Sequence, residues 1–246
     1  MVMVMAVPAT ANAGRTFYGW LQDTQVMPER GAEIQTFISE ENYQGPDPVA
    51  PAPPAKDHNT TWWLAPAIGI NDQLELALPV QFNWDHVDGG MPHTNFESYG
   101  AQIKYRFVTA DPVDAPDFVP AIRATIDRVV VGSRDEWVPE VDLIGSYQTG
   151  IVHAVVNAGV VGDITPRDQH FEARTGAGVS IETITDLRVG AEVFAELSLD
   201  SDTNGNWIAI GPNLSWSHGR SWLSASYGIG VYQIRDAPKL NWGIAF

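Results

Sequence analysis

The chain ends on the stretch KLNWGIAF, residues 239–246, in which apolar residues stand at every second position. Residues two apart share one face of a strand, so one face of this stretch is apolar up to the final residue and the other is small or polar. The apolar face consists of Leu240, Trp242, Ile244 and Phe246. A terminal phenylalanine is normally left in water, and the pattern therefore raises the question of what this face contacts.

Similar strand-like stretches follow one another from Ala32 onward, twelve in all. Most are ten to fourteen residues long, whereas strands in soluble proteins average about five or six residues and a tilted strand needs about nine to eleven to cross a bilayer. The stretches are residues 32–41, 60–70, 73–84, 96–107, 119–131, 137–148, 151–162, 170–182, 186–199, 207–217, 221–233 and 239–246. Their lengths favour strands that cross a membrane.

The alternation is clearest between Leu187 and Leu199. Every odd-numbered position there is apolar, while the even-numbered positions include Arg188, Glu192 and Glu196. A soluble β-sandwich also alternates, so this pattern alone leaves both folds open.

Aromatic residues and loop lengths favour a barrel. Aromatic residues near the ends of the apolar faces match the girdles of outer-membrane barrels; they are Trp84, Phe107, Phe171, Trp216, Trp222 and Phe246. Tight turns, as at 149–150 and 184–186, alternate with longer and mostly acidic connections, as at 42–59 and 200–205, and only the connection at 109–117 breaks this alternation. Short periplasmic turns and longer outer loops are typical of such barrels.

The prediction is an all-β protein, a transmembrane antiparallel up-and-down β-barrel of about twelve strands. A strand edge with unpaired backbone groups is not stable in the hydrocarbon interior of a membrane. The last strand should therefore close against the first and present its apolar face to lipid.

The composition is strongly acidic. The chain has 30 Asp and Glu against 14 Lys and Arg, a formal net charge of −16, and a pI of about 4.5. Phosphate binding needs clustered Lys and Arg, so a nucleic-acid partner is excluded, and divalent cations or basic ligands fit better. The chain contains no cysteine, hence no disulfide and no thiolate metal site.

Three regions are expected along the chain. Residues 1–13 end in Ala-Asn-Ala, the small-x-small pattern of a signal-peptidase site, but lack a basic start, so they predict a truncated signal peptide, with an N-terminal strand as the alternative. Residues 14–31 are then a periplasmic N-terminal segment, and residues 32–246 are the barrel domain. The predicted location is the outer membrane of a Gram-negative bacterium, with its lipid as a partner.

Three stretches carry a resemblance to a known group. A last strand of alternating apolar residues that ends in Phe resembles the C-terminal signature of bacterial outer-membrane barrels, which implies that Trp242, Ile244 and Phe246 are read by the barrel-assembly machinery. The stretches GINDQLELALPVQF and MPERGAEIQTFIS, with Gly31 before the first strand, are similar to outer-membrane barrels that are often labelled as transporters. The resemblance spans the chain after residue 13 and implies a barrel without specifying a substrate.

The polar faces of the strands predict a charged lumen. The inward residues are expected to be Glu75, Lys104, Arg106, Arg123, Asp127, Glu140, Asp142, Glu172, Arg174, Arg188, Glu192 and Glu196. Charged rings tune selectivity in channels. Charged side chains that are removed from water need partners. The alternative is therefore an interior in which arginines and carboxylates pair and block the passage of solutes.

Two loops carry weak metal signals. Asp200, Asp202 and Asn204 stand at positions one, three and five of a calcium-loop pattern that lacks its closing Glu, so weak surface Ca²⁺ is the alternative to a plain hairpin turn. His86 and His93 share a loop without a fixed spacing, which favours solvated histidines over metal ligands. No other cofactor is expected.

Motifs for catalysis are missing. The sequence has no nucleophile elbow, phosphate loop or HExxH. An outer-membrane lipid hydrolase would need a Ser or Thr beside a His at the outer rim. The candidates are His170 with Ser133 or Thr165, while His153 stands deeper on an apolar strand.

The functional prediction is therefore a non-enzymatic, narrow passive channel for small polar solutes, leaning toward cations because the chain is acidic. The alternatives are a non-conducting structural or adhesive barrel with a paired polar interior, and an outer-membrane lipid hydrolase.

Overall fold

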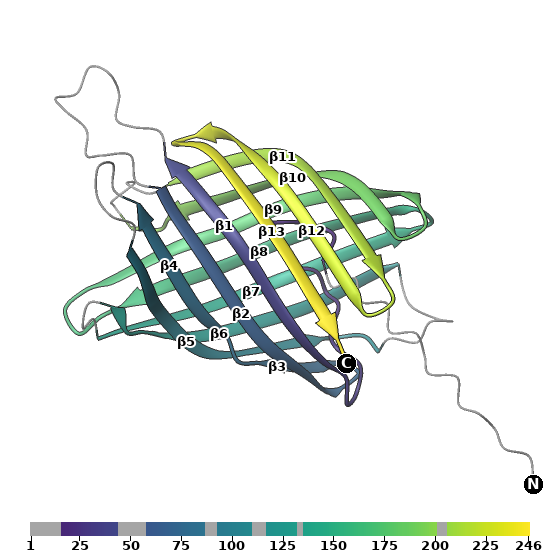
Figure 1. The fold of residues 1–246 in the computed structure, drawn as a ribbon, viewed down its shortest axis with the longest axis horizontal. Helices are drawn as coiled ribbons and strands as arrows, with labels where there is room; N and C mark the ends of the chain where they lie inside the picture. Colours follow the sequence, from purple (N-terminus) through teal and green to yellow (C-terminus); the bar gives the residue numbers. More distant parts are fainter. Residues whose placement is uncertain (1–15, 44–57, 87–92, 110–116, 132–134, 201–205) are drawn as a thin grey trace, which may run out of the picture.

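The computed structural model describes residues 16–43, 58–86, 93–109, 117–131, 135–200 and 206–246. They form one antiparallel sheet of thirteen strands that closes on itself (Figure 1). The strands are β1 (Ala32–Tyr43), β2 (His58–Asn71), β3 (Leu74–Ala77), β4 (Val80–His86), β5 (His93–Arg106), β6 (Phe118–Val129), β7 (Glu136–Thr149), β8 (Val152–Ile164), β9 (Gln169–Ile184), β10 (Leu187–Ser198), β11 (Trp207–His218), β12 (Ser221–Tyr232) and β13 (Ile234–Ala245).

The barrel has twelve crossings, because β3 and β4 are two halves of one strand. Both pair with β2 on one side and with β5 on the other. The interruption at Leu78 and Pro79 divides a stretch that the sequence predicted as one strand, since proline has no N–H for the ladder. The Leu78 N–H still donates to the carbonyl of Pro66, and the Gly100 N–H donates to that of Pro79.

The first and last strands close the barrel as predicted. Glu33 pairs with Ala245 and Phe37 with Asn241, and the Phe246 N–H donates to the carbonyl of Ala32. We call the end where β1 begins and β13 ends the inner end, and the opposite end the outer end. No helix in the described ranges is long and apolar enough to span a membrane.

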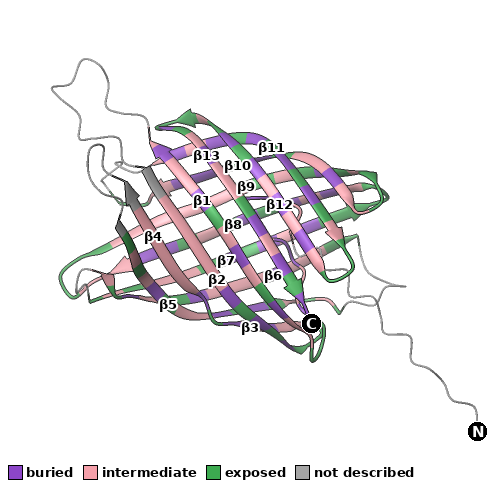
Figure 2. Cartoon of the chain, in the orientation of Figure 1, coloured by how far each residue is buried: buried purple, intermediate pink, exposed green. Residues whose placement is uncertain are grey.

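Buried and exposed residues alternate along strands such as β11 and β12, and the alternation appears as stripes in Figure 2. The apolar face of the last strand lies on the outside, where Ile244 and Phe246 are exposed. Leu143 and Ile210 on other strands are exposed in the same way. This outer surface is the apolar face that the sequence predicted for contact with lipid.

Two local expectations are corrected. Trp222 does not belong to an outer aromatic girdle; its indole is buried inside the barrel, where Nε1 donates to Glu33 Oε1 at 3.0 Å. The last connection is a reversal at Gln233, which has a positive φ of 53°, so Asp236 and Pro238 are paired within β13 and do not form a loop. The proposed signal peptide and the connection at 110–116 lie outside the described residues.

Candidate functional site

Six of the twelve charged residues that the sequence assigned to the lumen are buried in the structure, and the other six are half-buried. Lys104, for example, alternates with the exposed Ile103 and Tyr105. The twelve residues fall into two groups, because another part of the chain fills part of the lumen.

That filling is the N-terminal segment, which we define as residues 16–27. The sequence suggested a periplasmic location, but the structure corrects this: Tyr18, Leu21 and Asp23 are 0, 1 and 1% exposed inside the barrel. Figure 1 shows the segment as a purple trace within the ring of strands. Side chains this inaccessible leave no room for water beside them, so the segment fills the part of the lumen that surrounds them.

Glu192 on β10 is the principal anchor of the N-terminal segment. Its carboxylate accepts the backbone N–H of Gly19 at 2.9 Å and those of Trp20 and Leu21 at 3.2 and 3.3 Å. Three donors converge on one buried carboxylate, and such charge-assisted hydrogen bonds are the stronger kind. Glu192 therefore holds a chain segment in place and is not an open selectivity group.

Other strands hold the backbone of the segment in the same manner. Asn157 on β8 forms two bonds with Gln22, accepting from its N–H at 2.6 Å and donating to its carbonyl at 2.9 Å. Asn241 on β13 donates to the carbonyl of Gly19 at 2.9 Å. Glu75 on β3 accepts from the N–H of Met27 at 2.8 Å. Inward polar side chains thus replace the water that this backbone would otherwise need.

His153 on β8 links to two side chains of the segment. Its Nδ1 lies 3.1 Å from the hydroxyl of Tyr18, and its Nε2 lies 3.4 Å from a carboxylate oxygen of Asp23. The hydroxyl of Thr24 forms a further side-chain bond, 2.5 Å long, with Ser146 on β7. These contacts explain a histidine on a strand that otherwise reads as apolar.

Trp20 is the apolar anchor. Its ring stacks on Phe194 and meets Trp207 edge-on, both with centroids 5.3 Å apart, and its Nε1 donates to the carbonyl of Ala237 at 2.9 Å. The surrounding cluster also contains the fully buried Ile234.

Glycines on β9 form the seat for this segment. A Cβ at Gly178 would lie 2.5 Å from the ring of Tyr18, and one at Gly176 would lie 2.5 Å from a methyl group of Leu21. Both positions face inward, and only a residue without a side chain leaves room there.

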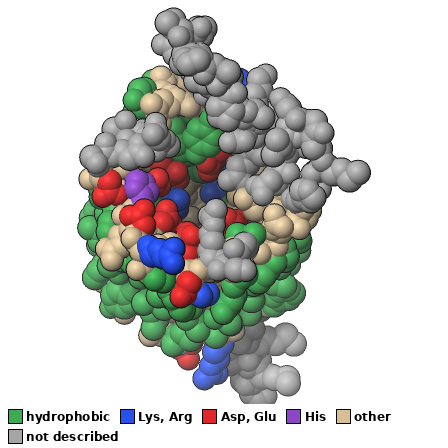
Figure 3. Space-filling model, turned by 90° about the vertical axis from the view of Figure 1, so that its left-hand side faces the viewer, with side chains coloured by type: hydrophobic (Ala, Val, Ile, Leu, Met, Phe, Trp, Pro, Cys, Tyr) green, Lys and Arg blue, Asp and Glu red, His purple; other side chains and the backbone are tan. Residues whose placement is uncertain are grey.

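Beside the N-terminal segment the lumen holds a cavity of about 360 Å³, which we call the vestibule. Trp20 and Gln22 of the segment line it, together with inward side chains from most of the barrel strands. At the outer end, charged side chains gather around a hollow inside a rim of hydrophobic ones (Figure 3).

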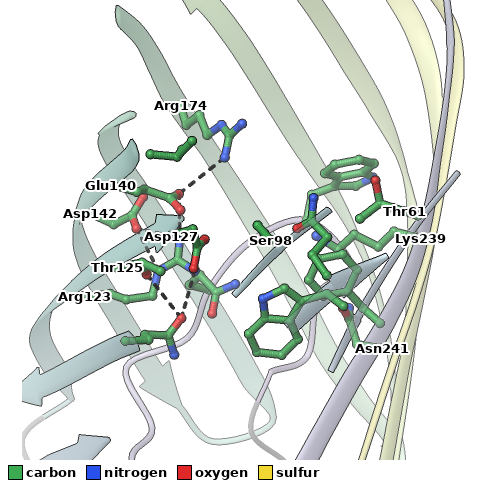
Figure 4. Close-up of a pocket in the computed structure, with 18 of the residues that line it drawn as sticks. Thr61, Ser98, Arg123, Thr125, Asp127, Glu140, Asp142, Arg174, Lys239 and Asn241 are labelled. Atoms are coloured by element: carbon green, nitrogen blue, oxygen red, sulfur yellow. Dashed lines mark hydrogen bonds and ion pairs between the residues drawn. The ribbon is translucent and has the colours of Figure 1, made fainter. Parts of the chain in front are cut away.

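An ionic network forms one wall of the vestibule (Figure 4). Arg123 lies 2.6 Å from Glu140 and 2.7 Å from Asp142. Arg174 lies 3.7 Å from Glu140 and 3.1 Å from Glu196. The two arginines share Glu140, so one network joins strands β6, β7, β9 and β10.

The vestibule carries more acidic than basic groups. Its lining contains eight carboxylates, which are Glu41, Glu97, Asp127, Glu136, Glu140, Asp142, Asp163 and Glu196, and three basic groups, which are Arg123, Arg174 and Lys239.

The remaining predicted lumenal residues lie away from this network. Arg188 stands over the ring of Phe17 at 4.4 Å and pairs with Glu182 at 3.2 Å. Arg106 is at the inner end of β5, beside Asp72, and Lys104 is buried one position deeper on the same face. Glu172 is near the outer rim, 3.2 Å from His170.

The weak metal and catalytic candidates find other partners. Asp200 accepts from the Phe171 N–H at 2.9 Å and lies 2.7 Å from His170 Nδ1. The side chain of Thr165 bonds to the carbonyl of Asp168 and not to a histidine. No group of three His, Asp or Glu side chains that could hold a metal occurs among the described residues. Asp202, Asn204, Ser133 and the side chains of His86 and His93 lie outside them.

The residues that sequence reasoning missed are those of the N-terminal segment. One signal was present: Phe17, Tyr18, Trp20 and Leu21 form an apolar group that water would not stabilise. A second signal was the GAG stretch on β9, where the inward Gly176 leaves room for Leu21.

Solved structures match the chain over most of its length. The COG4313 outer membrane channel from Pseudomonas putida F1 has a TM-score of 0.58 at 9% identity, covering 91% of this chain and 98% of that one. The beta domain of the Bordetella autotransporter Brka has a TM-score of 0.56 at 10% identity, and the match covers 89% of this chain and 100% of that one. The KdgM porin in complex with disordered oligogalacturonate has a TM-score of 0.53 at 10% identity, and the match covers 87% of this chain and 99% of that one.

No family model matches the sequence, and no curated protein matches it either. At these identities the likeness shows the fold, which is that of a bacterial outer-membrane β-barrel. The structures that share it include channels and an autotransporter domain, so the function must be argued from the lumen.

Proposed function

We propose that this barrel is a narrow passive channel for small polar solutes, in which the vestibule sets the preference and the N-terminal segment is a movable constriction. The observation that supports it is the vestibule itself, a polar cavity above a segment that is not part of the barrel wall. A purely structural barrel would have no need for such a cavity. The KdgM and COG4313 likenesses are consistent with a channel.

The excess of carboxylates in the vestibule supports a preference for cations. In this proposal the N-terminal segment moves aside during conduction, because the buried Tyr18 and Leu21 take up space in the lumen that a solute would need. The second candidate, a non-conducting barrel, is favoured by the close packing of this segment, and conductance separates the two.

The test is single-channel conductance of residues 14–246, refolded and inserted in a planar bilayer under a salt gradient. We expect current steps with a cation-leaning reversal potential. The double variant Glu136→Gln/Asp163→Asn should shift that potential toward zero, whereas Glu29→Gln, which removes a charge at the inner end, should leave it unchanged. A silent but β-rich, heat-modifiable insertion of the protein and of a variant lacking residues 16–27 would contradict the channel.

A further inference from the structure

Lys239 differs from the other cations of the vestibule. Its ammonium lies 4.0 Å from the ring centroid of Phe37 and 4.6 Å from that of Trp20. Arg123 and Arg174 are each paired with carboxylates, but Lys239 forms no ion pair or hydrogen bond with the part of the chain that the structure describes. The contacts of the Lys239 ammonium are therefore the faces of two aromatic rings.

No carboxylate of the described residues lies within ion-pair distance of this charge, and Glu41, Glu140 and Glu192 act on it only from farther away. A cation over an aromatic face gains about 0.5 to 2 kcal/mol, whereas a charge withdrawn from water is costly unless it is paired. Lys239 is half-buried and lines the vestibule, so an anionic group that enters this space can reach its ammonium.

Asp127 on β6 is the corresponding negative group. It lines the same cavity and forms no hydrogen bond or ion pair within the described ranges. The guanidinium of Arg123, four residues away on the same face, is committed to Glu140 and Asp142. Figure 4 places Asp127 and Lys239 on opposite sides of the cavity.

We propose that the vestibule binds a small zwitterionic solute, with its carboxylate at Lys239 and its ammonium at Asp127. The excess of carboxylates repels a simple anion. A simple cation carries no negative group that could pair with Lys239. A molecule that carries both charges pairs both groups. The cavity volume lies within the range of about 300 to 1,000 Å³ of small-molecule sites. The proposal rests on the proposed channel, because it names the class of solute for the same vestibule.

The test is equilibrium binding to the refolded full chain in detergent by titration calorimetry. The probes are ω-amino acids from glycine to 6-aminohexanoate, each beside the amine and the acid of equal carbon number. At the best-fitting length, we expect the amino acid to bind about tenfold more tightly than either partner.

Two substitutions assign the ends. Lys239→Gln should abolish the advantage of the amino acid over the matched amine, and Asp127→Asn should abolish its advantage over the matched acid. Lys239→Arg should keep the preference, and Arg30→Gln, which removes an exposed charge at the inner end, should not change it. Heat-modified mobility shows whether each variant is folded.

Equal binding of amino acid, amine and acid at every length overturns the proposal, as does a folded Lys239→Gln variant that keeps the preference. The readout does not require permeation. Binding by a protein that is silent in a bilayer would keep this site and contradict the channel, whereas conduction without any zwitterion preference would keep the channel and overturn this site.

Discussion

Glu192 and Glu196 stand four residues apart on the inward face of β10, yet they bind different partners. Glu192 accepts three backbone N–H groups of the N-terminal segment. Glu196 pairs with Arg174 at 3.1 Å and accepts from the indole of Trp207, beside the vestibule. The same residue type fixes a chain segment in the dry half and contributes to an ionic network in the wet half.

This comparison shows that a charged lumen does not by itself indicate a pore. Around the N-terminal segment the polar side chains satisfy a backbone, as Asn157 and Glu75 do. In the outer half they face water and one another. What a side chain faces therefore decides whether it acts on stability or on ions, and substitutions in matched pairs can separate the two roles.

The largest effect is expected at Trp20. Trp20→Ala removes the ring that packs between Phe194 and Trp207, and loss of a buried Trp costs about 3 to 5 kcal/mol. We expect the segment to undock, so that a cysteine at the buried position 24 becomes reactive to an impermeant maleimide in Thr24→Cys. The chain has no other cysteine, which makes the label specific.

Trp63→Ala is the control for this prediction. It removes an equally large ring from the vestibule wall, where Trp63 stacks on Phe37. Labelling at position 24 should stay slow. Equal labelling in both variants would mean that Trp20 is not an anchor of the segment.

The next effect is expected at the two glutamates of β10. Glu192→Gln removes the charge from three hydrogen bonds, a loss of about 2 to 4 kcal/mol, and should raise the open probability of the channel at least about 30-fold. Glu196→Gln should leave open probability unchanged and reduce cation preference. Single-channel recording measures both, and interchange of the two outcomes would contradict the division of the lumen.

The smallest effect is expected in the ionic network. Arg123→Met leaves Glu140 and Asp142 without their closest cation, and we expect about 1 to 2 kcal/mol of lost stability, because the vestibule is wet. The reversal potential should move further toward cations. Arg128→Met breaks a more exposed pair with Asp135 and should cost less in urea unfolding from lipid vesicles. A larger loss for Arg128→Met would contradict the ranking.

Much of the barrel was predictable from the sequence. A period of two sustained over ten or more residues identifies the crossings, and along β5 it separates the buried Lys104 from the exposed Ile103 and Tyr105. Two residues shifted the strand limits away from the predicted ones. Pro79 has no N–H for the ladder, and Gln233 has a positive φ, and each overrides the pattern around it.

The division of the lumen was not predictable in this way. Residues 16–27 have no periodic pattern, and their position depends on single contacts from strands far away in sequence, such as Asn157 and Asn241. Trp222 was placed outside because an aromatic residue near a strand end suggested a girdle, although it shares its face with the buried Ser224 and Ser226, and inside the barrel its indole bonds to the Glu33 carboxylate.

The most direct test of this division is a reversible lock on the N-terminal segment. The hydroxyls of Thr24 and Ser146 lie 2.5 Å apart, which suits a disulfide in the double variant Thr24→Cys/Ser146→Cys. We predict that the oxidised protein passes no current in a planar bilayer and that a reductant restores the current of the parent chain. Equal currents before and after reduction would contradict a constriction that has to move.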